Sequence, residues 1–145
     1  MKNLLIAFFM VMFISFGKIT VGQTADLKVT VSGIKELKGK IMIGVFDNAF
    51  DFKSKKNPVA SKAIPAKDST VSYTFSDLAH DRYAIAVFHD ENNDSELNTK
   101  KLGIPLEGVG FSSKVASKLH QPIFPEASFL LKSDTTIVVN LYYTK

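Results

Sequence analysis

Apolar and polar residues alternate along three stretches of the chain. In residues 27–31, 70–75 and 135–141 the apolar side chains fall mainly on odd-numbered positions. A period of two is typical of a β-strand with one face against a core and the other in solvent. We therefore expect three half-buried strands whose odd-numbered apolar residues enter one common core.

Other stretches are apolar at consecutive positions. Residues 40–46, KIMIGVF, are apolar on both faces, which predicts a central strand that is covered on both sides. This strand follows residues 27–31 closely enough for the two to form a hairpin. Residues 82–88 and 127–131 predict two further strands.

The segments between these strands are expected to be connections. Residues 47–65 predict a long surface loop, with a short helical turn capped by Asn48 and one aromatic side chain turned inward. A second helical turn is expected at 112–119, before Pro122 and Pro125 stop regular structure.

About seven segments resemble strands, and the chain has neither a heptad repeat nor a long amphipathic helix. This pattern predicts an all-β fold, namely a single antiparallel β-sandwich of immunoglobulin-like or transthyretin-like shape. The length of 145 residues suits one domain of this kind.

The N-terminal segment is expected to be an export signal and not part of the fold. Lys2 precedes an apolar run at 4–16, and this run is shorter than the about 20 residues that a spanning helix needs. Thr20 and Gly22 are small enough for a cleavage site, so residues 1–22 match a secretory signal peptide. We expect a periplasmic or secreted mature domain at 23–145, with no stable membrane span after cleavage; an uncleaved anchor is the alternative.

Composition narrows the class of protein further. The chain has no cysteine, so it forms no disulfide and lacks the residue that a lipid anchor would need. Its formal charge is +4, and Lys2 and Lys18 fall in the signal segment, which leaves the mature chain near +2. The remaining lysines are scattered, so nucleic-acid binding is not expected.

An acidic and amide-rich loop carries the main candidate chemistry. Asp90, Asn92 and Asp94 form a D-x-N-x-D pattern, which places side-chain oxygens at positions 1, 3 and 5 of a calcium loop. The backbone carbonyl of Glu96 and the side chain of Asn98 would supply positions 7 and 9. Calcium is therefore the candidate cofactor, and a metal-free turn rich in Asp and Asn is the alternative.

The match to an EF-hand is only partial. Ser95 stands where an EF-hand has glycine, and Lys101 stands where it has a bidentate glutamate. The loop also lies between predicted strands and not between helices. Glu107 is a carboxylate that could return to complete the ligand shell.

His89 and Glu107 are the candidate ligand-binding residues. His89 ends a predicted strand, where it would brace the loop by hydrogen bonds. The alternative is a hydrolase in which His89 works with Asp90 or Glu107 as an acid–base pair. That alternative needs His89 and a carboxylate to face one open pocket. The chain has neither the histidine spacing of a zinc site nor a G-x-S-x-G motif.

The stretch 83–112 resembles the DUF2141 family, a set of uncharacterised exported bacterial proteins. The residues that match the family pattern are Tyr83, Ala84, His89, Asp90, Glu91, Asn92, Asp94, Leu97, Gly103, Pro105, Glu107, Gly110, Phe111 and Ser112. Ser95 and Asn98 depart from it, because the family usually has glycine and aspartate there. The resemblance implies an exported β-sandwich and no known activity.

The hypothesis that follows is a small exported module that binds a ligand or a protein partner at the cell envelope. A structural or carbohydrate-binding role is a further alternative, with Tyr142 and Tyr143 as its aromatic platform. Packing on an edge strand is the other role open to these two tyrosines.

Overall fold

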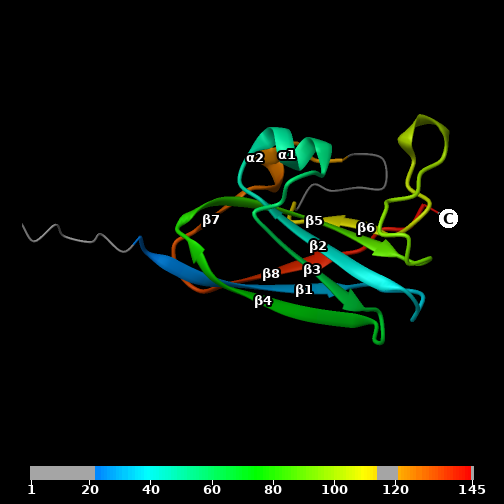
Figure 1. Cartoon of the computed structure of the whole chain (residues 1–145), viewed down its shortest axis with the longest axis horizontal. Coiled ribbons are helices and arrows are strands. Elements are labelled where there is room, and N and C mark those ends of the chain that lie inside the picture. The colour runs from blue at the N-terminus through cyan, green and yellow to red at the C-terminus, as the bar shows by residue number, and fades with distance from the viewer. Residues whose placement is uncertain (1–21, 114–120, 145) are drawn as a thin grey trace, which may run out of the picture.

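The computed structural model describes residues 22–113 and 121–144 (Figure 1). Its elements, in chain order, are β1 (Thr24–Ser32), β2 (Lys40–Phe46), α1 (Ala49–Ser54), β3 (Ala60–Pro65), β4 (Thr70–Ala79), β5 (Asp81–Asp90), the 3-10 turn η1 (Lys101–Gly103), β6 (Val109–Phe111), α2 (Phe124–Ala127), β7 (Phe129–Leu131) and β8 (Thr135–Asn140). The predicted signal peptide, residues 1–22, lies almost wholly outside the described residues, as does most of the helical turn expected at 112–119. Within the described part, no helix is long and apolar enough to cross a membrane.

The strands form two sheets that pack as a sandwich, which confirms the predicted all-β fold class. One sheet has the order β4-β1-β8, and the other has the order β3-β2-β5-β6, with β7 also paired to β5. The described strands pair antiparallel except for β1 and β8, which run parallel. The parallel pair joins the first and last strands of the sandwich.

The core lies between the sheets and is built as the alternation predicts. Leu27, Val29 and Val31 of β1 are fully buried, and their rungs continue into β4 and β8. Phe75 and Val139 are buried in the same cluster. The odd-numbered apolar residues of all three alternating strands therefore pack on one core, as expected.

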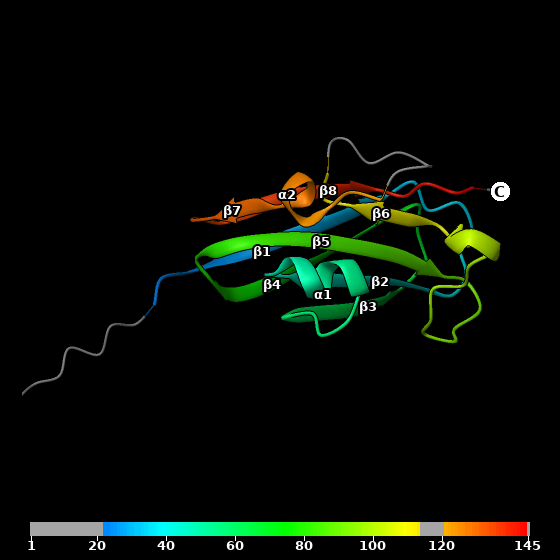
Figure 2. The ribbon, with the colours of Figure 1, turned by 90° about the horizontal axis from the view of Figure 1, so that it is seen from above.

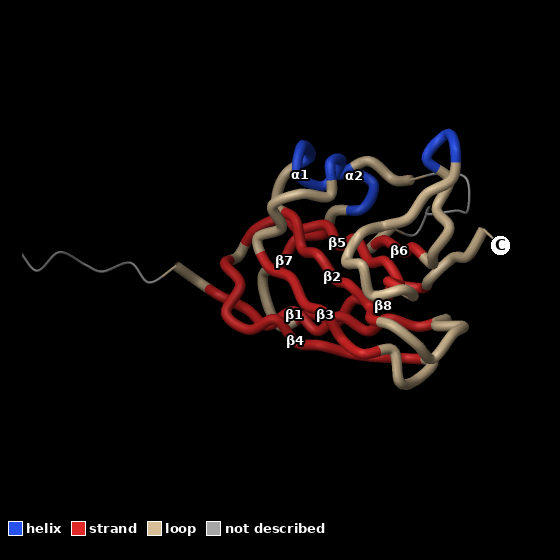
Figure 3. Tube along the Cα trace, turned by 45° about the vertical axis from the view of Figure 1, so that its right-hand side comes forward, coloured by secondary structure: helices blue, strands red, loops and turns tan. Residues whose placement is uncertain are grey.

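A second, smaller apolar cluster covers the outer face of β5. Helices α1 and α2 lie side by side over this strand, on the side of the molecule away from β1 and β4 (Figures 2 and 3). The ring of Phe52 from α1 is fully buried and makes edge contacts with Phe46, Phe111 and Phe124 at 5.9–6.1 Å between ring centroids. Residues 83–87 of β5 are consequently buried at every position.

The region 47–65 is partly different from the expectation. Asn48 caps α1 by accepting the backbone N–H of Asp51 at 2.9 Å, and Phe52 is the inward aromatic, as predicted. Residues 60–65, however, form β3 at the edge of the second sheet. Only Ala60 and Ile64 of this strand reach the core, so its sequence shows little alternation.

The predicted hairpin between residues 27–31 and 40–46 is wrong. The two strands belong to different sheets, because β1 pairs with β4 and β8 whereas β2 pairs with β3 and β5. The segment between them crosses from one sheet to the other. Residues 109–111 form a short strand that the sequence did not indicate, and the strand expected at 127–131 is confined to 129–131.

Val139 tests the position of β8 in the core. Val139→Asp should lower the free energy of unfolding by more than about 3 kcal/mol, because it buries an unpaired charge. The neighbouring Val138 is 59% exposed and faces the other way, so Val138→Asp is the matched control and should cost about 1 kcal/mol or less. Urea unfolding of both variants measures the difference; equal losses would contradict the assigned strand register.

Candidate functional site

Strand β5 ends at one end of the sandwich, opposite the start of β1, and delivers His89 and Asp90 to the following loop (Figure 1). The loop, residues 91–108, contains a small hairpin. Its arms are joined by the hydrogen bonds from Lys100 N to Ile104 O (2.7 Å) and from Leu106 N to Asn98 O (2.9 Å). This hairpin returns the chain to the sandwich, where Glu107 lies beside β5.

Asp90 orders the first half of the loop from inside the protein. Its side chain is fully buried, and its two oxygens accept the backbone N–H groups of Asp94 at 3.1 Å and Ser95 at 3.0 Å. The ammonium group of Lys40, from the paired position on β2, lies 3.5 Å from Oδ2. A buried carboxylate needs this kind of compensation, and here backbone donors and one lysine supply it.

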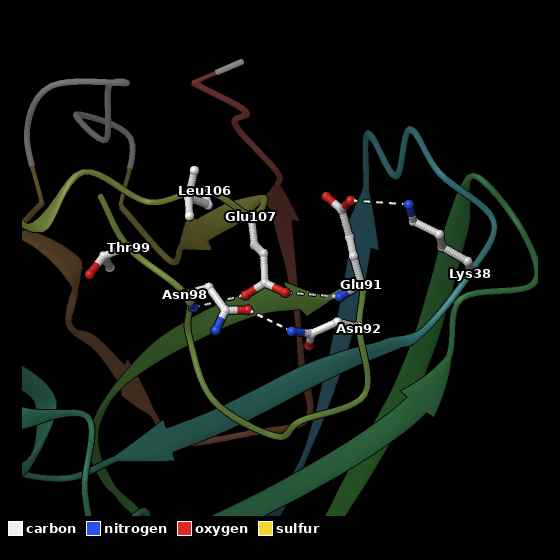
Figure 4. Close-up of a pocket in the computed structure, with 7 residues that line it drawn as sticks. All are labelled: Lys38, Glu91, Asn92, Asn98, Thr99, Leu106 and Glu107. Atoms are coloured by element: carbon white, nitrogen blue, oxygen red, sulfur yellow. Dashed lines mark hydrogen bonds and ion pairs between the residues drawn. The ribbon is translucent and has the colours of Figure 1, made fainter. Parts of the chain in front are cut away.

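Glu107 joins the two ends of the same loop. Its side chain is only 4% exposed, and its oxygens accept Glu91 N–H and Asn98 N–H, each at 3.0 Å (Figure 4). Hydrogen bonds from backbone N–H groups to a carboxylate are among the stronger ones in proteins. A single side chain therefore holds the backbone at residues 91 and 98 in place.

His89 connects this end of β5 to the C-terminal segment. It is fully buried, with Nε2 2.8 Å from Lys38 O and Nδ1 2.9 Å from the hydroxyl of Tyr143. A carbonyl oxygen only accepts, so Nε2 donates to Lys38 O, and in the neutral imidazole Nδ1 then accepts the Tyr143 O–H. Burial raises the pKa of Tyr143, which keeps this hydroxyl a donor at neutral pH.

Two glycines allow the close packing around these side chains. Gly39 has φ +68°, and a Cβ there would lie 2.0 Å from the backbone oxygen of Asp90. A Cβ on Gly108 would lie 2.6 Å from the ring of Tyr143. Neither position has room for a larger residue without displacement of the segment that carries Asp90 or Tyr143.

The outer rim of the loop is a cluster of two amides and one carboxylate. Asp94 Oδ2 accepts the side-chain N–H groups of Asn92 (2.8 Å) and Asn98 (2.9 Å), and Oδ1 accepts Glu96 N–H at 2.8 Å. The hydrogen bond from Asn98, with smaller contributions from Glu96 N–H and Asn92, lowers the pKa of Asp94 below its usual 3.8. Asp94 therefore stays ionised at neutral pH, at the exposed edge of the loop.

A solvent-exposed hollow of about 500 Å³ lies against this loop; its lining residues are Lys38, Glu91, Asn92, Asn98, Thr99, Leu106 and Glu107 (Figure 4). A second hollow of about 270 Å³ adjoins it and is lined by Lys35, Glu36, Lys38, Glu91 and Tyr143. The ion pair between Lys38 Nζ and Glu91 Oε2, at 3.5 Å, stands between the two. The loop face thus combines opposite charges, amides and one apolar side chain.

Most of the sequence-predicted site residues meet here. Asp90, Asn92, Asp94 and Asn98 form one connected network, whereas the exposed Glu96 contributes its backbone N–H. In the described ranges, no group of three or more His, Asp or Glu side chains is placed to hold a metal ion. His89 braces the loop, and neither hollow reaches it. Asp90 is as deeply buried as His89, whereas Glu107 lines the first hollow, and the hydrolase alternative stays a prediction.

Several functional residues were not predicted from the sequence. Lys38 and Lys40 precede Asp90 by about fifty positions in the chain, and Thr99 and Leu106 belong to a hairpin without a strand pattern. Tyr143, for which the sequence predicts either an aromatic platform or packing on an edge strand, is buried beneath the loop and hydrogen-bonded to His89. No local pattern in the sequence marks these long-range contacts.

Comparison with known protein families agrees with the family resemblance that the loop sequence shows. The model of the family described as "Uncharacterized protein conserved in bacteria (DUF2141)" matches residues 29–138. The chain belongs to the DUF2141 family. Searches of curated proteins and of solved structures found no match to this chain.

The structure explains two features of the DUF2141 pattern in this chain. Ser95, which replaces the family's usual glycine, has φ +66°, a backbone conformation that glycine adopts without strain. Ser112, the last residue of the pattern, donates to Ala127 O at 2.7 Å and accepts Ile85 N–H at 2.7 Å. It therefore ties β5 to α2 and has a structural role.

Glu107 tests the brace of the loop. Glu107→Gln replaces one accepting oxygen by an N–H₂ group that faces a backbone N–H, so the free energy of unfolding should fall by about 1–3 kcal/mol. Glu96→Gln at the exposed rim is the matched control and should change stability by less than about 0.5 kcal/mol. Urea unfolding of both variants measures this; a Glu107→Gln variant as stable as the parent would contradict the brace.

Proposed function

We propose that the mature protein is an exported, non-catalytic binding module of the cell envelope, and that its ligand or protein partner docks on the loop face at residues 91–107. One observation carries this proposal: the hollow of about 500 Å³ lies against a loop whose backbone is already held by buried carboxylates. A preordered surface loses little conformational entropy on binding. Export rests on the signal-like segment 1–22.

The lining of the hollow favours a ligand with both amide groups and charge. The side chains of Asn92 and Asn98 supply donors and acceptors, and Lys38 and Glu91 supply one charge of each sign. Asn98 and Lys100 turn their backbone groups toward the opposite arm of the hairpin. The intervening Thr99 therefore directs its N–H and C=O outward. An extended peptide segment matches this set, because its main chain carries the same groups.

Chemical-shift mapping tests the binding face. A pool of random-sequence hexapeptides, added to the ¹⁵N-labelled mature protein, should shift the amide signals of residues that line the hollow. Lys38→Glu should abolish these shifts, because it replaces the ion pair between Lys38 and Glu91 by two negatively charged side chains. Lys53→Glu on α1, away from the loop, is the matched control and should leave them unchanged.

Soluble fragments of cell-wall polysaccharide form the second arm of this experiment. Shifts with these sugars and none with peptides would redirect the proposal to a carbohydrate ligand. Absence of shifts at the loop face with both probes would contradict the proposed binding face.

Calcium binding by the loop is the second candidate function. The observation that favours it is the convergence of Asn92, Asp94 and Asn98, whose side-chain groups lie 2.8–3.0 Å from one another at the rim. Lys40 already neutralises Asp90, and Asn98 is uncharged, so the affinity should be modest, at about 0.1–1 mM as in extracellular calcium modules.

The melting temperature in calcium against chelator tests this candidate. At ten times the dissociation constant, calcium should stabilise the fold by about 1.4 kcal/mol. Asn98→Asp should strengthen calcium binding by adding a charge, and it should weaken the metal-free loop, where it places a second carboxylate beside Asp94. Identical melting curves of the parent protein in calcium and in chelator would rule out the calcium site.

A further inference from the structure

The tip of the hairpin in the 91–108 loop exposes apolar side chains. Leu102 is 98% exposed, more than any other large apolar side chain in the described part of the chain, and Ile104 is 44% exposed. The tip, which contains η1, projects from the sandwich (Figures 1 and 3). A single exposed leucine is common on protein surfaces, so the conformation and the neighbours of Leu102 decide what its exposure means.

The backbone conformation at residue 102 makes a leucine unexpected there. Leu102 has φ +68° and ψ +17°, and the following Gly103 has φ +72°. This left-handed region favours glycine and asparagine, so a leucine in it is strained. An almost wholly exposed side chain gains no packing energy within the protein that could offset the strain. Folding of the described chain therefore does not account for this leucine, whereas contact of its side chain with an apolar phase does.

Positive charge accompanies the apolar tip. Lys100 and Lys101 are exposed and directly precede Leu102. The stretch 97–106, LNTKKLGIPL, has no acidic residue, and the acids that flank it, Glu96 and Glu107, belong to the base of the hairpin. Apolar side chains beside lysines match an anionic lipid bilayer, because its acyl region takes up the former and its headgroups attract the latter. A projecting tip also suits a fluid surface, which needs no preformed cavity to receive it.

The stem of the hairpin holds this tip in place. The N–H of Lys100 donates to Ile104 O at 2.7 Å, and the N–H of Gly103 donates to Lys100 O at 3.2 Å. At the base, the buried Glu107 accepts the N–H of Asn98 at 3.0 Å. A preordered tip loses little conformational entropy when it meets a surface.

We propose that the hairpin tip at residues 100–104 attaches the protein to anionic lipid bilayers. Leu102 and Ile104 enter the interfacial region, and Lys100 and Lys101 lie among the headgroups. Two apolar side chains and two lysines give weak, reversible binding, comparable to the about 10⁴ M⁻¹ of a single acyl chain. The inference rests on the export proposed above, but vesicle binding is measured on the purified mature protein, so its failure is distinct from a failure of export or of peptide binding.

Cosedimentation with phosphatidylglycerol vesicles, at up to about 10 mM lipid, measures this binding. Leu102→Asn should weaken it by at least about tenfold, because the apolar side chain is lost. The same variant should keep or raise the melting temperature, since asparagine tolerates a left-handed backbone. Leu130→Asn is the matched control: Leu130 is 47% exposed on β7, which pairs with the start of β5 at the other end of the sandwich, so its loss should leave vesicle binding unchanged.

The lysines are tested in the same assay. Lys100→Gln/Lys101→Gln should weaken binding to phosphatidylglycerol by about 25-fold, or about fivefold for each lysine, whereas Lys53→Gln/Lys56→Gln, at exposed positions in and after α1, is the control of equal net charge and should not. A parent that stays in solution with these vesicles, or that binds phosphatidylcholine equally well, would overturn the proposal. Binding that Leu102→Asn leaves intact would do the same, because it would show attraction by charge alone.

Discussion

Two buried carboxylates control the structure of the loop end of this protein. Asp90 and Glu107 have little or no exposed surface, and their four oxygens accept four backbone N–H groups of the loop. Hydrogen bonds to charged groups contribute about 1.5–3 kcal/mol each, and an unpaired buried charge is strongly unfavourable. In this arrangement of the loop backbone, both carboxylates are satisfied.

The sandwich makes this arrangement rigid. Strand β5 is covered by the core on one face and, at Ala84 and Ala86, by α1 and α2 on the other. His89 joins that end to Lys38 O on one side and to Tyr143 on the other. The loop face is therefore supported by both sheets, and its exposed amides and charges are presented to solvent in fixed positions.

The local alternation of apolar and polar residues was enough to predict the strands that show it. It failed for elements whose contacts join residues far apart in the sequence. In residues 27–31, the apolar side chains at odd-numbered positions identified the core-facing side of the strand, because burial of one face of a strand imposes a period of two. Strand β3 was missed because most of its side chains are exposed. The parallel pairing of β1 with β8 joins residues more than one hundred positions apart, and no periodicity records such a pair.

The candidate site was also predictable from the sequence only in part. The D-x-N-x-D spacing and the nearby His89 and Glu107 identified the loop, because Asp and Asn bond to backbone groups a few residues away. The sequence did not show which N–H groups would donate to each carboxylate, since the same oxygens could also bind calcium. The partners Lys40, on β2, and Tyr143, beyond the end of β8, are brought to the loop only by the tertiary fold.

Native-state hydrogen exchange of the mature protein in chelator tests most directly whether buried carboxylates order this loop. The amide protons of Glu91, Asp94, Ser95 and Asn98 donate to Asp90 or Glu107. They should exchange at least about tenfold more slowly, corrected for sequence, than the amide of Leu102 at the exposed hairpin tip. Exchange of all four as fast as that of Leu102, with protection only after calcium is added, would contradict the account.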